Sequence, residues 1–161
     1  MRAEINQGQL LNKFKNAKEY IVDVKKQALR NAVDHLVERS PIDTGVYIDN
    51  HQVAPGNATP SSPRTSSEGL RGYYDIYGRN YNRLDPSFPE RAEARQRLWQ
   101  DIEALPDDFK RASISNSAEH FNLVEYGWPR KAGYAPFTSM KSGWPQFKID
   151  AEATARARYK K

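Results

Sequence analysis

The stretch Ser40-Pro41-Ile42-Asp43-Thr44-Gly45 decides the fold, because a long helical pattern stops there and an extended segment is expected to follow. Proline holds the preceding residue in extended geometry and cannot continue a helix. Asp43 and Thr44 can bind nearby backbone N–H groups through their side chains, and Gly45 can adopt a positive φ. We therefore predict a fixed corner of the fold at Pro41, Asp43, Thr44 and Gly45.

A long helix is predicted before the corner, over residues 9–39. Its apolar residues recur at alternating steps of three and four, which is typical of a helix with one buried stripe. The predicted stripe contains Leu10, Phe14, Ala17, Ile21, Val24, Ala28, Ala32 and Leu36. About thirty residues at about 1.5 Å each span roughly 45 Å, which is longer than a small core needs. We expect the first turns to project from the body or to pack on a neighbouring copy, with a two-stranded coiled coil as the alternative.

After the corner, the patterns predict strands over residues 46–54 and 109–117 and helices over residues 90–105, 118–126 and 146–161. Gly127 is expected to end the second of these helices as a left-handed cap. The predicted fold class is therefore α+β. A long N-terminal helix packs on a small antiparallel sheet, accompanied by two or three further helices and a long inserted loop.

The composition bounds the class of protein. At 161 residues the chain is expected to form a single domain over residues 1–161, with an insertion at about 56–105. The apolar fraction of 38% and the mean hydropathy of −0.87 are low for a self-contained globule and suit an obligate assembly. The absence of cysteine favours synthesis in a reducing compartment, and the N-terminal residues predict neither a signal peptide nor a membrane helix. The net charge of +5 favours polyanions in a general way.

The insertion contains a segment that interleaves four tyrosines with three arginines. It follows a Ser-, Thr-, Pro- and Gly-rich stretch, residues 57–71, that has no structural period and is expected to be an exposed loop. The residues that we predict to contact a neighbouring subunit or partner are Arg71, Tyr73, Tyr74, Tyr77, Arg79, Tyr81 and Arg83. Tyrosine and arginine are enriched in protein–protein contacts, and they also suit stacking on bases and pairing with phosphates. An ordinary strand or surface hairpin is the third interpretation.

No catalytic, cofactor or metal site is expected. The chain lacks the usual hydrolase, nucleotide and dinucleotide motifs, and His35, His51 and His120 are not spaced as zinc ligands. A metal-dependent phosphodiesterase would need Asp43, Asp49 and Glu125 to converge with His51 or His120. Each of these residues has a simpler interpretation, such as a turn former at Asp43 or a local cap or ion pair at Glu125.

The order of the elements and motifs resembles the tail-completion or neck proteins of tailed bacteriophages. Members of this head–tail joining family show a helix followed by S-P-[VI]-D-T-G, then V-E-[FY]-G and a short A-x-P-F element. The matching positions here are Ser40, Pro41, Asp43, Thr44 and Gly45; Val124, Glu125, Tyr126 and Gly127; and, without the spacer residue, Ala135, Pro136 and Phe137. The chain departs from the pattern in its longer segment over residues 57–105 and in the residues that follow Phe137.

The resemblance implies a non-enzymatic virion protein. It would form a homo-oligomeric ring of six or twelve copies in the neck, between head connector or adaptor proteins and tail proteins, after synthesis in the host cytoplasm. Glu125, Tyr126, Gly127 and Pro136 would help to form the corner of its sheet, and such a ring would line the DNA passage. The basic C-terminal residues Arg156, Arg158, Lys160 and Lys161 would then face DNA without reading its sequence. The alternative function is a small basic nucleic-acid-binding protein. Neither function requires a membrane.

Overall fold

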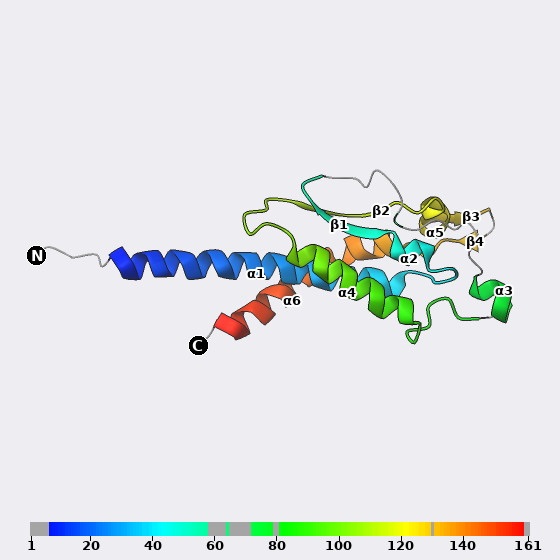
Figure 1. Cartoon of the computed structure of the whole chain (residues 1–161), viewed down its shortest axis with the longest axis horizontal. Helices are drawn as coiled ribbons and strands as arrows, with labels where there is room; N and C mark the ends of the chain where they lie inside the picture. The colour runs from blue at the N-terminus through cyan, green and yellow to red at the C-terminus, as the bar shows by residue number, and fades with distance from the viewer. Residues whose placement is uncertain (1–6, 58–63, 65–71, 79–80, 130, 160–161) are drawn as a thin grey trace, which may run out of the picture.

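The structure is a computed structural model that describes residues 7–57, 64, 72–78, 81–129 and 131–159. It confirms the α+β class: a long N-terminal helix accompanies a two-stranded antiparallel sheet, a small hairpin and several further helices (Figure 1). In chain order the elements are α1 (Gln7–Arg39), α2 (Val46–Asp49), β1 (His51–Pro55), α3 (Tyr73–Tyr77), α4 (Pro89–Glu103), β2 (Ala112–Asn116), α5 (Phe121–Tyr126), β3 (Gly127–Trp128), β4 (Lys131–Ala132) and α6 (Pro136–Tyr159).

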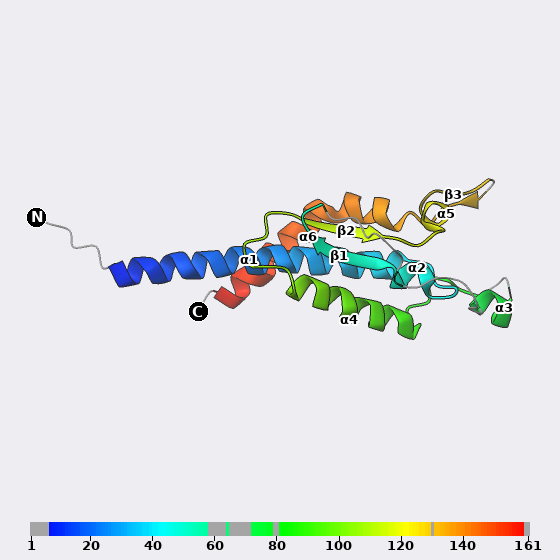
Figure 2. The same cartoon turned by 45° about the horizontal axis from the view of Figure 1, so that its top comes forward.

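Helix α1 is the axis of the molecule, and only its C-terminal half is covered. Figures 1 and 2 show the first turns of α1 projecting beyond the body, whereas α4, α6 and the β1–β2 sheet surround the second half. Phe14 and Ile21 of the predicted stripe are accordingly exposed, as is Leu11 beside it. The first turns of α1 therefore project from the body of the single chain.

The buried half of α1 carries two rows of core residues instead of the single predicted stripe. Ala32 and Leu36 pack with Phe137 and Met140 of α6. A neighbouring row faces α4 and the sheet and forms the larger cluster, which contains Leu29, Val33, Val37, Ile42, Ile48, Val53, Ala94, Leu98, Ile102, Leu105 and Phe109. A helix covered on two sides needs a wider apolar face than a helix covered on one side, so the stripe alone was too narrow a prediction.

The predicted strand over residues 46–54 is wrong in its first half. Gly45 has φ +81° and begins the short helix α2, in which Val46, Tyr47 and Ile48 are all buried. Three consecutive buried residues do not fit a strand with one exposed face, because alternate residues of a strand point to opposite sides. The strand begins only at His51, where burial alternates along β1.

The sheet consists of β1 and β2 in antiparallel register, from the pair His51 and Asn116 to the pair Pro55 and Ala112. The second strand therefore lies within the predicted range of residues 109–117. Helix α4 buries Ala94, Leu98 and Ile102 as its spacing predicts. It packs against both α1 and β1, which places the sheet and α4 over the same half of α1.

Helix α6 begins ten residues earlier than the predicted helix over residues 146–161. It starts at Pro136, a favourable first position for proline, and runs through Gly143 and Pro145. Packing of Phe137 and Met140 against α1 extends the helix across these two poor helix formers. Local propensity alone therefore misplaced the start of α6.

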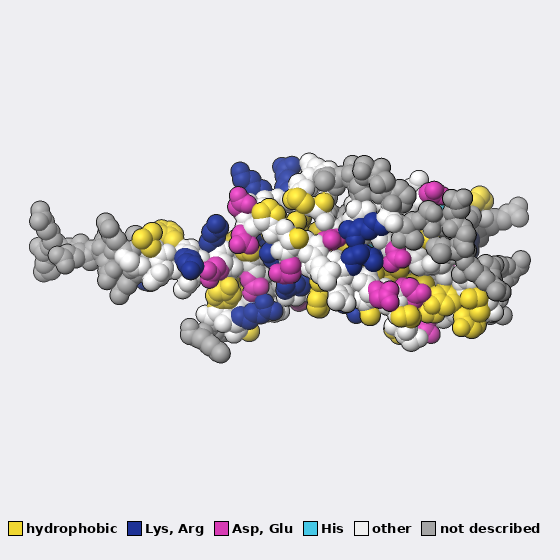
Figure 3. Space-filling model, in the orientation of Figure 1, with side chains coloured by type: hydrophobic (Ala, Val, Ile, Leu, Met, Phe, Trp, Pro, Cys, Tyr) yellow, Lys and Arg dark blue, Asp and Glu magenta, His cyan; other side chains and the backbone are white. Residues whose placement is uncertain are grey.

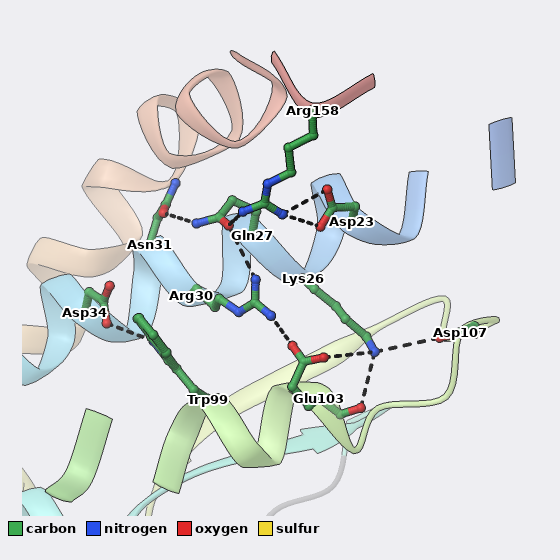
Figure 4. A network of polar contacts seen from close by, with 10 residues as sticks. All are labelled: Asp23, Lys26, Gln27, Arg30, Asn31, Asp34, Trp99, Glu103, Asp107 and Arg158. Atoms are coloured by element: carbon green, nitrogen blue, oxygen red, sulfur yellow. Dashed lines mark hydrogen bonds and ion pairs between the residues drawn. The ribbon is translucent and has the colours of Figure 1, made fainter. Parts of the chain in front are cut away.

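A polar network links α1 to α4 and to α6 near the middle of the molecule (Figure 4). Arg30 and Glu103 form an ion pair, and Lys26 donates to the Glu103 carbonyl at 3.2 Å. On the other side, Arg158 Nη1 lies 3.0 and 3.1 Å from the carboxylate oxygens of Asp23. These contacts hold the end of α6 against α1.

Candidate binding pocket at the chain corner

Residues from two of the three sequence motifs that carry the family resemblance, the chain corner and Val124, line one pocket of about 860 Å³. The corner after α1, the start of α2, helix α5 and the segment around the β3–β4 hairpin surround it. Its lining residues are Pro41, Asp43, Thr44, Gly45, Tyr47, Arg83, His120, Val124, Lys131 and Tyr134. The structure thus brings together residues that are about 80 positions apart in the chain.

Asp43 is the anchor of the corner. The Tyr81 hydroxyl donates to Asp43 Oδ1 at 2.8 Å, and the backbone N–H of Tyr73 donates to the Asp43 carbonyl at 3.1 Å. A Cβ atom at Gly72 would lie only 2.5 Å from Asp43 Oδ1, so this approach requires glycine. The predicted corner and the predicted Tyr/Arg segment are therefore in direct contact.

The Tyr/Arg segment divides into residues that stabilise the body and residues that face outward. The Tyr73 ring stacks on Phe88 with centroids 4.7 Å apart, and its hydroxyl donates to Glu90 at 2.9 Å. Arg83 lies over the Tyr81 ring at 5.0 Å, whereas Tyr77 is exposed. Arg71, Arg79 and the side chain of Tyr74 lie outside the described residues. The structure therefore gives Tyr73 and Tyr81 intramolecular roles that the sequence prediction did not include.

Glu125 of the second motif caps helix α6. Its side chain is buried and accepts from the backbone N–H groups of Phe137 at 3.1 Å and Thr138 at 2.7 Å, and from the Thr138 hydroxyl at 2.6 Å. A carboxylate at this position satisfies unpaired N–H groups and complements the helix dipole. Pro136, the first residue of α6, is fully buried beside it, whereas Tyr126 points into solvent.

Gly127 ends α5 with φ +89°, as expected, but its ψ of −173° is extended instead of left-handed helical. The chain then enters the β3–β4 hairpin. A Cβ atom at Gly127 would lie 2.1 Å from the Lys131 carbonyl oxygen, which explains the need for glycine at this crossing.

A buried hydrogen-bond relay lies behind the pocket. Asn116 accepts from the Ala118 N–H through Oδ1, so its amide nitrogen donates to the Tyr47 carbonyl at 2.7 Å and to His51 Nδ1 at 2.8 Å. His51 then carries its proton on Nε2 and donates to Ser40 Oγ at 2.8 Å, and Ser40 donates to the Leu36 carbonyl. A histidine that activates a serine must accept the serine proton. The relay runs in the opposite direction and stabilises the corner.

The pocket combines an apolar wall with positive charge. Tyr47, Val124 and Tyr134 supply apolar surface, and Arg83 and Lys131 supply cations. Burial lowers the pKa of His120, so this side chain is neutral at pH 7. Burial, together with the charge of Glu125, raises the pKa of Tyr47, whose hydroxyl has no hydrogen-bond partner among the described residues. The lining therefore carries both signs of charge, because Asp43 also belongs to it.

The groups proposed for a phosphodiesterase have separate roles. Asp49 lies 3.4 Å from Arg97, Glu125 caps α6, and His51 is fully buried in the relay. Among the residues that the structure describes, no group of three or more His, Cys, Asp or Glu side chains could hold a metal ion. Within the same part of the chain, no helix is long and apolar enough to span a membrane.

The predicted DNA-facing arginines of α6 are engaged in ion pairs. Arg156 lies 3.2 Å from Glu152, and Arg158 binds Asp23 (Figure 4). Lys160 and Lys161 lie outside the described residues. Sequence reasoning missed a different basic surface, in which Lys25, Lys110, Arg111 and Lys148 line one groove with Trp144. These residues come from three separate stretches, so spacing along the chain gave no signal of it.

A comparison with models of known protein families, with curated proteins and with solved structures finds no match to this chain. Function therefore has to follow from the residues and their arrangement.

Proposed function

We propose that this chain is a structural subunit of the neck of a tailed bacteriophage. Copies of it form a ring that joins the head connector to the tail and surrounds the DNA passage. The proposal is supported first by the sequence motifs, because residues from two of the three that carry the resemblance line one pocket. A polar composition and a helix much longer than the body needs also suit a subunit that is completed by its neighbours.

The observation that carries the proposal is a pair of unlike apolar surfaces at opposite ends of the molecule. The first is the α1 arm, which we define as residues 8–21, with Leu11, Phe14 and Ile21 more than half exposed. The second is the distal surface, defined by Ile76 and Tyr77 of α3, which are also more than half exposed. Figure 3 shows apolar side chains on the projecting part of α1 and again at the far end of the body.

Two different surfaces on one subunit favour head-to-tail association. Such contacts form closed rings when the rotation between neighbours divides a full turn, and open filaments otherwise. The α1 arm also carries Lys13, Lys15 and Lys18 beside its apolar residues. Their mutual repulsion disfavours pairing of two arms with each other and favours contact of an arm with a different surface.

Double substitution on each surface tests the proposal by native mass spectrometry and negative-stain microscopy. We expect Phe14→Glu with Ile21→Glu to abolish the oligomer, because two charges would be buried against an apolar partner surface. Ile76→Glu with Tyr77→Glu should do the same. The matched control is Asn12→Glu with Asn16→Glu, which adds the same charge to exposed polar positions of the arm and should leave assembly intact.

Mixing the two double variants tests the head-to-tail geometry. Each variant keeps one intact surface, so the mixture should form a heterodimer and no ring. A wild-type protein that is monomeric at every concentration tested, or double variants that assemble like the wild type, would contradict the proposal.

A further inference from the structure

The groove missed by the sequence analysis lies on the side of the body, between α1, the start of β2 and α6. It has a volume of about 410 Å³, and its residues are Val24, Lys25, Ala28, Leu29, Asn57, Phe109, Lys110, Arg111, Ala112, Trp144, Lys148 and Glu152. It shares no residue with the corner pocket, the α1 arm or the distal surface. A ligand of the groove would therefore contact none of the residues that define these three surfaces.

The positive charge of the groove is not balanced by nearby carboxylates. Among the residues that the structure describes, Lys110, Arg111 and Lys148 have no carboxylate within 4.0 Å. The one acidic residue of the lining, Glu152, is paired with Arg156 at 3.2 Å. By contrast, Arg158 has already found an internal partner. The groove is thus the better candidate for an external anion.

The body holds one of these cations in place. The Lys25 ammonium donates to the Phe109 carbonyl at 3.0 Å and lies 5.1 Å from the centre of the Phe109 ring. It therefore sits at the base of the groove, whereas Lys110, Arg111 and Lys148 are exposed at its rim. Figure 3 shows Lys and Arg side chains gathered at the end of the body where the α4–β2 connection lies.

Trp144 adds an apolar wall to the groove. Trp144 is 37% exposed, although it belongs to α6, which packs on α1. A basic channel with an exposed aromatic side chain suits a nucleic-acid backbone, because cations bind phosphates and the ring contacts the sugar or base surface. An acidic protein segment would use the cations equally well but would not need the exposed aromatic wall that Trp144 supplies.

We propose that this groove, with Lys25, Lys110, Arg111 and Lys148, binds the phosphate backbone of DNA without sequence preference. The binding does not rest on ring formation, because a single subunit carries the whole groove. In an assembled ring the same surface would be the part of each subunit that contacts DNA, in place of the α6 arginines that the sequence suggested.

The salt dependence of binding gives a quantitative test, measured by fluorescence anisotropy with a mixed-sequence 30-bp DNA duplex. If all four cations contact phosphates, the slope of log K against log salt is about −3.6, and affinity falls about 150-fold between 50 and 200 mM salt. The triple variant Lys110→Gln, Arg111→Gln and Lys148→Gln should have a slope near −0.9, which corresponds to a loss of only about 3.5-fold over the same range.

The matched control is Arg39→Gln, Lys131→Gln and Lys141→Gln, which removes the same charge from exposed positions outside the groove, the α1 arm and the distal surface. This control should keep the wild-type slope. An equal change of slope in both triple variants would show attraction to net charge alone and would overturn the inference. Binding of polyglutamate through the groove in preference to the duplex would also overturn it, in favour of an acidic protein partner.

The oligomeric state of each sample separates this inference from the proposed function. DNA binding through the groove by a protein that stays monomeric at every concentration tested would support the inference and count against the ring. A ring with no groove-dependent binding would do the reverse.

Discussion

His51 is the most tightly constrained side chain of the corner, because its two ring nitrogens both bind buried polar groups. Burial, and to a smaller degree the charge of Arg97, lowers its pKa from 6.5 to about 3. The neutral form fits the relay because Nδ1 accepts from Asn116. Protonation of Nδ1 would place two donors against each other, and Asn116 cannot turn over without losing its bonds to Ala118 and Tyr47.

This arrangement predicts acid sensitivity of the fold. The pKa of His51 is lower in the folded state, so the unfolded state binds the proton first, and stability is lost as the pH falls below about 6.5. One proton contributes about 1.4 kcal/mol for each pH unit. Urea unfolding at pH 7.0, 6.0, 5.5 and 5.0 should show that the free energy of unfolding falls with decreasing pH. The loss per pH unit should increase toward this value, in a pH range where most carboxylates do not yet titrate.

Variants at the three histidines assign the effect. His51→Gln should be less stable at pH 7 but should lose most of the slope. Burial also lowers the pKa of His35 and of His120, so His35→Gln and His120→Gln are the comparison variants. Both should keep the larger part of the dependence of stability on pH. A slope that survives in His51→Gln would place the acid sensitivity elsewhere.

At the scale of elements, the start of α6 depends on a carboxylate from another helix. Glu125 accepts hydrogen bonds from two N–H groups and a hydroxyl at the first turn of α6. The motif that ends α5 therefore also caps the N-terminus of α6. The cap joins α5 to α6 and so closes one side of the corner pocket.

Glu125→Gln should lower the free energy of unfolding by about 1–3 kcal/mol, because an amide supplies one acceptor where the carboxylate supplies two. Thermal and urea unfolding measure the loss. Glu119→Gln is the matched control, since Glu119 is exposed and makes none of these contacts. Equal stability of the two variants would mean that the cap contributes nothing measurable.

Elements were predictable where one local pattern determines them. The buried faces of α4 and the antiparallel strand before residue 117 follow from spacing, and Gly127 ends α5 as expected. Helix α2 was missed because Val46, Tyr47 and Ile48 favour strands locally, while burial on all sides makes them one turn of helix. The early start of α6 depends on Glu125, which lies 11 residues before Pro136 and belongs to another element.

The candidate sites were predictable only where a local pattern of residues determines them. The corner residues could be found because turn chemistry is local. That these residues lie next to Tyr134 and Lys131 depends on tertiary packing, which no spacing along the chain encodes. The same holds for the groove, because its residues come from three separate stretches.

At the scale of the whole molecule, packing divides α1 into two parts of different stability. Residues 28–37 lie in the core, whereas every described side chain over residues 11–19 is exposed. A short stretch of helix without tertiary contacts is marginal in water. The arm is therefore the part of the fold that gains most from a neighbouring subunit.

Hydrogen exchange measured by mass spectrometry should separate the two parts. In a dilute, monomeric sample, amides of residues 11–19 should exchange about 10³-fold faster or more than amides of residues 28–37, because the core opens only with global unfolding at a cost of about 5 kcal/mol or more. In an assembled sample, the arm should become protected while the core is unchanged. Residues 106–111 between α4 and β2, where most side chains are exposed, serve as the internal control and should exchange alike in both samples. An arm that stays unprotected in the oligomer would show that the subunits meet through other surfaces, and the distal surface would then have to pair with something other than α1.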